Sequence, residues 1–103
     1  MTNQEFLIEF EKSVLRSKKT LMKKEAEYSQ GKDRLDQFHR AASAEGTNPA
    51  EALRGMMTKH FTSICDMCKD PTSHSLRQWN EKLGDLRNYT FLLDALVRDL
   101  GAK

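Results

Sequence analysis

The chain has few of the features that mark secreted or membrane-spanning proteins. Its 103 residues include two cysteines and two prolines, and no stretch approaches the roughly 18 uninterrupted apolar residues of a membrane span. The segment from Met1 to Phe10 lacks the basic start and the apolar run of a secretory signal. We therefore expect a cytoplasmic protein with no membrane partner, in which both cysteines remain thiols.

Familiar catalytic and metal-binding motifs are scarce as well. The sequence contains no Gly-rich phosphate loop, no His-Glu-x-x-His and no Ser-His-Asp order. Cys65 and Cys68 form a single Cys-x-x-Cys, whereas a structural zinc site needs four ligands. We expect both cysteines to be structural, with Cys68 facing the core. His60 lies on the apolar side of its helix, which is typical of a packing histidine.

Net charge is small, but it is unevenly distributed. A formal charge of +2 does not by itself indicate a nucleic-acid-binding surface, and no recognition helix is evident, so nucleic acid is not an expected partner. One segment, however, contains six basic residues and no acidic one: Lys12, Arg16, Lys18, Lys19, Lys23 and Lys24. Positions 12, 16, 19 and 23 share a helical face, so this segment predicts a positive ridge that attracts anions.

Helical periodicity and capping signals dominate the rest of the chain. Thr2 and Glu5 form a capping box that predicts a helix over residues 3–29, ended by Gly31. Asp33 is a candidate cap for a short helix that Gly46 would end. The length suits one domain over residues 1–103, and with 38% hydrophobic residues its core must be thin, so we expect a homo-oligomer.

Two further helices follow, each with a clear start. Asn48, Pro49 and Glu51 occupy the positions favoured at a helix N-terminus, and Pro71 predicts the end of that helix at Asp70. Ser75 opens another capping box and starts a helix that reaches Leu100. The fold class is therefore all-α: a small bundle of three main helices plus one short helix.

The last helix has two apolar rows on different faces. One row has the 3-4 spacing of a coiled-coil seam, with Thr90 as its exception: Leu76, Trp79, Leu83, Leu86, Leu93, Val97 and Leu100. The other comprises Tyr89, Leu92 and Leu96. Two rows require two neighbours, and we expect these to be the third helix and a second subunit.

Polar stripes on the last two long helices provide candidate metal ligands. Lys59, Ser63, Asp66 and Asp70 share one sector of the third helix, and Glu81, Asp85 and Asn88 share one sector of the fourth. If the stripes faced each other, their carboxylates could hold Mg²⁺. The alternative is that both stripes are ordinary solvated faces. Tyr28 and Phe38 could supply a stacking surface for a base, although Phe38 also suits the core.

Three groups of residues resemble a known family. They are the segment 24–28 leading into 36–42; Lys59-His60 with Ser63-Ile64 and Asp66-Met67; and Glu81 with Asp85, Asn88-Tyr89 and Leu92-Leu93. Together, over about Lys23 to Leu96, they resemble small phage-encoded helical proteins related to nucleotide-modification-associated domains and to the all-α MazG-like NTP pyrophosphohydrolases. The resemblance implies a phosphorylated, nucleotide-like ligand.

The same resemblance departs from the enzymes at their metal ligands. The enzymes hold Mg²⁺ with Glu-x-x-Glu and Glu-x-x-Asp, whereas here Glu25 precedes Glu27 by two residues and Glu81 precedes Asp85 by four. We therefore expect binding without turnover, in which a phage protein sequesters a nucleotide signal of host defence. The alternatives are a Mg²⁺-dependent NTP pyrophosphohydrolase and an oligomeric protein-interaction module without a small ligand. Candidate ligand-binding residues are Lys19, Lys23, Tyr28, Arg40, Lys59 and Asn88, and candidate metal ligands are Asp66, Glu81 and Asp85.

Overall fold

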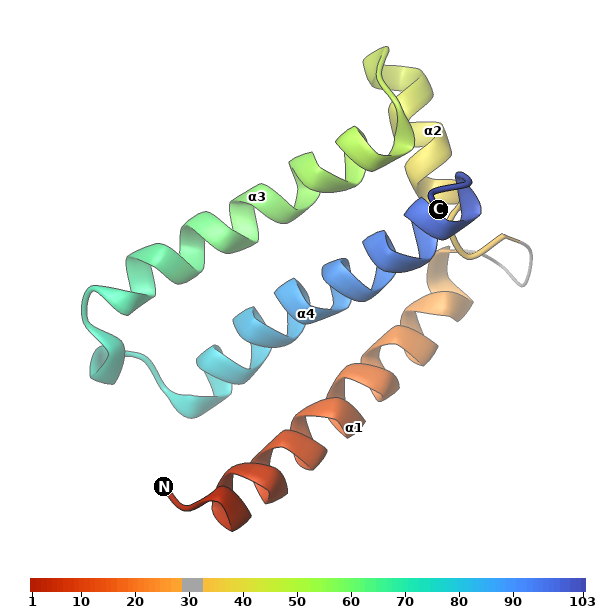
Figure 1. Ribbon diagram of the computed structural model, residues 1–103. Helices are drawn as coiled ribbons and strands as arrows, with labels where there is room; N and C mark the ends of the chain where they lie inside the picture. The colour runs from red at the N-terminus through yellow and green to blue at the C-terminus, as the bar shows by residue number, and fades with distance from the viewer. Residues whose placement is uncertain (29–32) are drawn as a thin grey trace.

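The computed structural model describes residues 1–28 and 33–103, and of residues 26–28 it describes the backbone alone. Four α-helices account for most of this part of the chain: α1 (Asn3–Tyr28), α2 (Asp36–Glu45), α3 (Pro49–Cys68) and α4 (Leu76–Asp99) (Figure 1). A short 3-10 turn, η1 (Pro71–Ser73), leads from α3 to α4. The described residues form no strand, so the predicted all-α bundle of three main helices and one shorter helix is confirmed.

The predicted capping groups begin three of these helices. At α1, Glu5 N donates to Thr2 Oγ1 at 3.1 Å and Thr2 N donates to Glu5 Oε2 at 3.3 Å. At α4, Gln78 N donates to Ser75 Oγ at 3.1 Å and Ser75 N donates to Gln78 Oε1 at 2.9 Å. At α3, the side chain of Asn48 accepts from the backbone of the third helical residue at 3.0 Å. These bonds satisfy backbone donors that the first helical turn leaves without a partner.

The helix boundaries differ from the sequence prediction in two places. Asp33 does not cap α2; its Oδ1 accepts from Leu35 N at 2.9 Å, so it closes the turn that precedes the helix. The third helix ends at Cys68 instead of Asp70, because the chain turns into η1 after the helix. Gly46 ends α2 with φ +70°, as predicted. The predicted terminator of the first helix, Gly31, lies outside the described residues.

The core lies where α2, α3 and α4 meet. Phe38, Leu53 and Leu96, one from each helix, are fully buried, and Leu35 joins them from the turn before α2. Burying each of these side chains stabilises the fold by about 1.5–3 kcal/mol relative to leaving it in water. On α4, the row of Tyr89, Leu92 and Leu96 supplies this core, whereas the two ends of the coiled-coil-like row are exposed: Leu76 is 80% exposed and Leu100 is 48% exposed.

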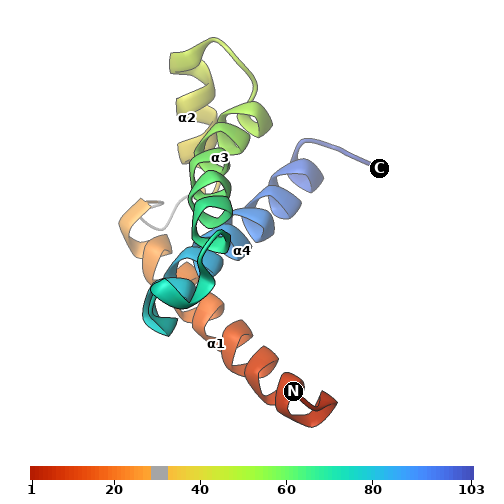
Figure 2. The ribbon, with the colours of Figure 1, turned by 90° about the vertical axis from the view of Figure 1, so that its left-hand side faces the viewer.

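The second neighbour of α4 is α1. In Figure 1, α4 lies between α3 and α1, and it packs against both. The residues through which α1 and α4 meet, such as Ser17 and Arg87, belong to neither apolar row of α4, so a second subunit on the coiled-coil-like row stays a prediction. Figure 2 shows the N-terminal half of α1 extending away from the other helices.

The two cysteines are not core residues. Cys65 and Cys68 are both exposed and free, so the expectation that Cys68 faces the core is wrong. At this end of α3, Ile64 and Met67 take the buried positions, and Cys68 is the last residue of the helix. In the part of the chain that the structure describes, no helix has the length and apolar character needed to cross a membrane.

Candidate functional site

A groove runs along the contact between α1 and α4. It has a volume of about 420 Å³. From α1 it is lined by Arg16, Ser17, Lys19, Thr20 and Lys24, and from α4 by Asn80, Glu81, Gly84, Asp85, Arg87 and Asn88. Three cations of the basic segment, Arg16, Lys19 and Lys24, thus face a wall of α4 that contains both carboxylates and a cation.

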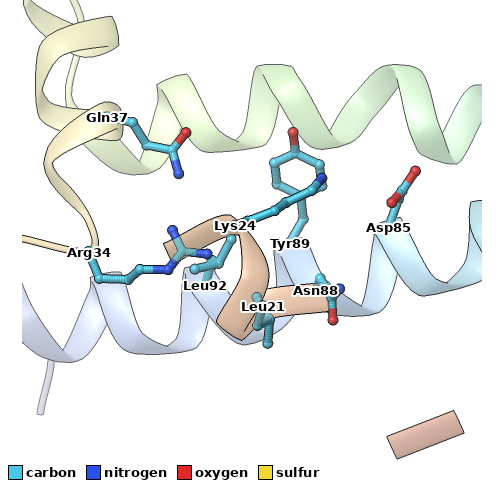
Figure 3. Close-up of a pocket in the computed structure, with 8 residues that line it drawn as sticks. All are labelled: Leu21, Lys24, Arg34, Gln37, Asp85, Asn88, Tyr89 and Leu92. Carbon is cyan, nitrogen blue, oxygen red and sulfur yellow. The ribbon is translucent and has the colours of Figure 1, made fainter. Parts of the chain in front are cut away.

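A narrower cavity of about 110 Å³ adjoins this groove (Figure 3). Its lining residues come from α1, the turn before α2, α2 and α4: Leu21, Lys24, Arg34, Gln37, Asp85, Asn88, Tyr89 and Leu92. Lys24, Asp85 and Asn88 line both spaces, so the groove and the cavity are neighbouring parts of one site. In Figure 3, Arg34 and Gln37 extend toward the middle of the cavity from its α2 end.

Two hydrogen bonds between side chains hold the walls of the groove together. Arg87 Nε donates to Ser17 Oγ at 3.2 Å, and Arg16 Nη2 donates to Asn80 Oδ1 at 3.5 Å. Ser17 is only 3% exposed, so this hydroxyl is buried between the helices and is satisfied by Arg87. The arginines that line the groove are therefore fixed in place by the helix opposite.

Two residues that line the cavity each have a buried side-chain atom with no partner among the described residues. These atoms are Nη1 of Arg34, a hydrogen-bond donor, and Oδ1 of Asn88, an acceptor. Asn88 is buried as a whole, with only 7% of the residue exposed. Leaving such a group unpaired costs about 1–3 kcal/mol. One of the two atoms is a donor and the other an acceptor, and each is a buried polar group that lacks the partner such groups normally have.

Asp85 also contacts α3, which packs on the side of α4 away from α1. Its Oδ2 lies 3.7 Å from Nδ1 of His60 on α3, and both side chains are largely buried. The His60 ring packs against Tyr89 with ring centroids 5.1 Å apart, as expected of a packing histidine. These contacts restrain the Asp85 carboxylate at the boundary between the groove and the cavity.

The structure brings together four of the nine predicted site residues: Lys19, Glu81, Asp85 and Asn88 all line the groove. The others lie elsewhere. Arg40 pairs with Asp36 at 3.0 Å on the surface of α2, while Lys23 and Lys59 are exposed and line neither space. The side chain of Tyr28 lies outside the described residues.

The three predicted metal ligands do not form one set. Asp66 is 69% exposed and pairs with Lys69 at 3.4 Å on the surface of the protein. Across the described residues, no group of three or more His, Cys, Asp or Glu side chains is arranged to hold a metal ion. Glu81 and Asp85 remain as two carboxylates on one wall of the groove.

The prediction missed Arg34 and Arg87. Arg34 lies in a short turn, where no periodicity assigns a side chain to a face, and Arg87 belongs to neither apolar row nor to the acidic stripe. Lys24 lay within the predicted basic segment but was not singled out. Lys24 follows Leu21 by three residues, so the two share a helical face, and Leu21 lines the same cavity. This spacing could have identified Lys24.

Comparison of the whole chain with protein-family models, with curated proteins and with solved structures found no match.

Proposed function

We propose that the site between α1 and α4 binds a phosphorylated, nucleotide-like small molecule and holds it without hydrolysis. The observation that supports this most directly is the pair of buried, unpartnered atoms on two residues that line the cavity, Arg34 Nη1 and Asn88 Oδ1. A phosphoryl oxygen accepts a hydrogen bond from the arginine, but it has no hydrogen to donate to the asparagine. The ligand therefore also carries an N–H or O–H group, which a base or a ribose supplies.

The charges around the site suit such a ligand. Arg16, Lys19 and Lys24 from α1 and Arg87 from α4 line the groove, and Arg34 lines the cavity. Lys19 and Lys24 form no ion pair within the described residues, so both ammonium groups are available to an anion. Glu81 and Asp85 occupy the opposite wall, where they disfavour a bare polyanion and favour a ligand with a donor group at that end.

The carboxylates in the groove support ligand binding without hydrolysis. The hydrolases that the sequence resembles use two pairs of carboxylates for Mg²⁺, and among the side chains that the structure describes only Glu81 and Asp85 supply carboxylates to the groove. Sequestration of a nucleotide signal, which the resemblance implies for a phage protein, requires affinity but no catalysis.

Isothermal titration calorimetry and thermal-shift measurements test the proposal. The protein is titrated with nucleoside mono-, di- and triphosphates and with cyclic nucleotides, each with and without Mg²⁺. We expect one class to raise the melting temperature independently of Mg²⁺. Arg34→Gln should weaken this binding at least tenfold, whereas Arg77→Gln, which removes an exposed arginine outside the site, should leave it unchanged.

The same samples distinguish the alternatives. Mg²⁺-dependent release of pyrophosphate that is lost in Asp85→Asn would replace sequestration with hydrolysis. The absence of any shift for every nucleotide would contradict both nucleotide functions and would favour the protein-interaction alternative.

A further inference from the structure

One face of α1 carries large apolar side chains that nothing in the described chain covers. We call it the α1 stripe: Leu7, Ile8, Val14, Leu15 and Met22. Their exposed fractions range from 43% for Val14 to 61% for Met22. At roughly 100° per residue, the five side chains span a sector of about 120° along the helix. An apolar stripe of this width is what a surface helix normally turns toward a partner.

The α1 stripe is distinct from the face that packs on α4. That face is centred on Ser17, which is 3% exposed and bonds to Arg87. Ser17 lies roughly a third of a turn away from the middle of the stripe at 100° per residue. A partner on the stripe therefore leaves the contact between α1 and α4 in place.

Two oppositely charged residues lie within the stripe. Glu11 and Lys18 fall near its centre on the helical wheel, and both are exposed. Neither forms an ion pair with another residue in the part of the chain that the structure describes. Their spacing of seven residues places them two turns apart on the same face.

The order of residues in the stripe is self-complementary when two copies run antiparallel. If the twofold axis passes between Val14 and Leu15, Val14 of one copy lies opposite Leu15 of the other. In the same register, Leu7 lies opposite Met22. Glu11 lies opposite Lys18, and the symmetry creates this pair twice. A parallel arrangement would instead place Glu11 against Glu11 and Lys18 against Lys18, which is unfavourable.

We propose that the protein forms a homodimer in which the α1 stripes of two copies pack antiparallel about the point between Val14 and Leu15. The stripe from Leu7 to Met22 is roughly 24 Å long at 1.5 Å per residue, which is enough for several turns of side-chain interdigitation. A second copy is the occupant because its charges match at both Glu11 and Lys18. An anionic lipid surface does not match, since it would repel Glu11 in the middle of the stripe.

Charge exchange tests this dimer. Sedimentation velocity is recorded for the full-length protein, for Glu11→Lys, for Lys18→Glu and for the variant with both changes. We expect the unmodified protein to be a dimer at micromolar concentration. Each single change places like charges opposite each other at two symmetric points, so it should raise the dimer dissociation constant roughly tenfold or more. The double variant restores opposite charges at both points and should restore the dimer.

Two matched controls use exposed charges outside the stripe. Glu45→Lys on α2 and Lys59→Glu on α3 change the net charge in the same way and should leave the dimer intact. Circular dichroism checks the fold of each variant, and we expect all of them to be folded because the altered side chains are exposed.

Several outcomes would overturn the proposal. A monomer at every concentration contradicts the dimer, and a dimer that is insensitive to both single changes contradicts the assignment to this stripe. A double variant that remains as weak as the single variants contradicts the antiparallel register. Monomeric protein that sediments with vesicles of anionic phospholipid would assign the stripe to a lipid surface instead.

Discussion

Arg87 of α4 and Ser17 of α1 are 70 residues apart in the sequence and are joined by a hydrogen bond of 3.2 Å between the two helices. The bond holds the guanidinium of Arg87, which lines the groove, and it also joins α4 to α1. Because Ser17 is almost fully buried, the guanidinium of Arg87 depends on this hydroxyl for one of its partners.

Removing that hydroxyl should destabilise the protein. Ser17→Ala leaves the Arg87 Nε without its partner, and we expect the free energy of unfolding to fall by about 1–2 kcal/mol. Ser13→Ala is the control, because Ser13 Oγ accepts a hydrogen bond of 3.0 Å from Arg16 at an exposed position. Urea denaturation of both variants provides the comparison, and equal effects would contradict the importance of the buried bond.

Replacing Asn88 by an apolar residue should raise the stability of the protein and weaken ligand binding. Oδ1 of Asn88 has no partner among the described residues, so Asn88→Leu removes a buried unpaired acceptor and should raise the free energy of unfolding by up to about 1 kcal/mol. The same change removes the acceptor that the proposed ligand would use. Urea denaturation and nucleotide titration of one preparation measure both effects. A variant that is clearly less stable would show that Asn88 has a structural partner.

Two leucines of α4, one from each apolar row, differ sharply in burial. Leu96 is fully buried and Leu76 is 80% exposed. Leu96→Ala should lower the free energy of unfolding by about 2–5 kcal/mol, because it removes transfer energy and leaves a cavity. Leu76→Ala should change it by no more than about 0.5 kcal/mol. Thermal or urea denaturation tests this difference, and comparable losses would mean that the coiled-coil-like row supplies the core instead.

Two glycines should respond to alanine in opposite ways. Gly55 lies inside α3, and a Cβ added there meets no atom within 4 Å, so Gly55→Ala should raise the free energy of unfolding by about 0.5–1 kcal/mol. Gly46 ends α2 with φ +70°, a conformation that strains an L side chain, so Gly46→Ala should lower it by about 1 kcal/mol. Melting temperatures of the two variants should shift in opposite directions, and a shift of the same sign would contradict this account.

The position of most helices could be predicted from local sequence alone. Three helices begin at Thr2 with Glu5, at Asn48, and at Ser75 with Gln78, because these side chains satisfy backbone groups only a few residues away. Asp33 was the exception. Its side chain bonds to Leu35, so the same local chemistry closes a turn instead of capping the helix.

The candidate site could be predicted only in part. The stripe of Glu81, Asp85 and Asn88 and the basic segment containing Lys19 follow from helical periodicity, and the structure brings them to one groove. Periodicity does not say which helix lies opposite a stripe, so Asp66 was grouped with carboxylates that it does not approach. Arg34 was missed because a turn residue has no periodic face.

Sequence by itself therefore determined the helical class, the capping residues and the charge distribution along α1, because these depend on interactions within a few residues of the same chain. The tertiary structure decided that α1 covers α4, that Leu96 and not Leu76 enters the core, and that Arg34 and Asn88 share a cavity. These outcomes depend on which faces of distant helices meet, and that choice is made by the total apolar area that packing removes from water.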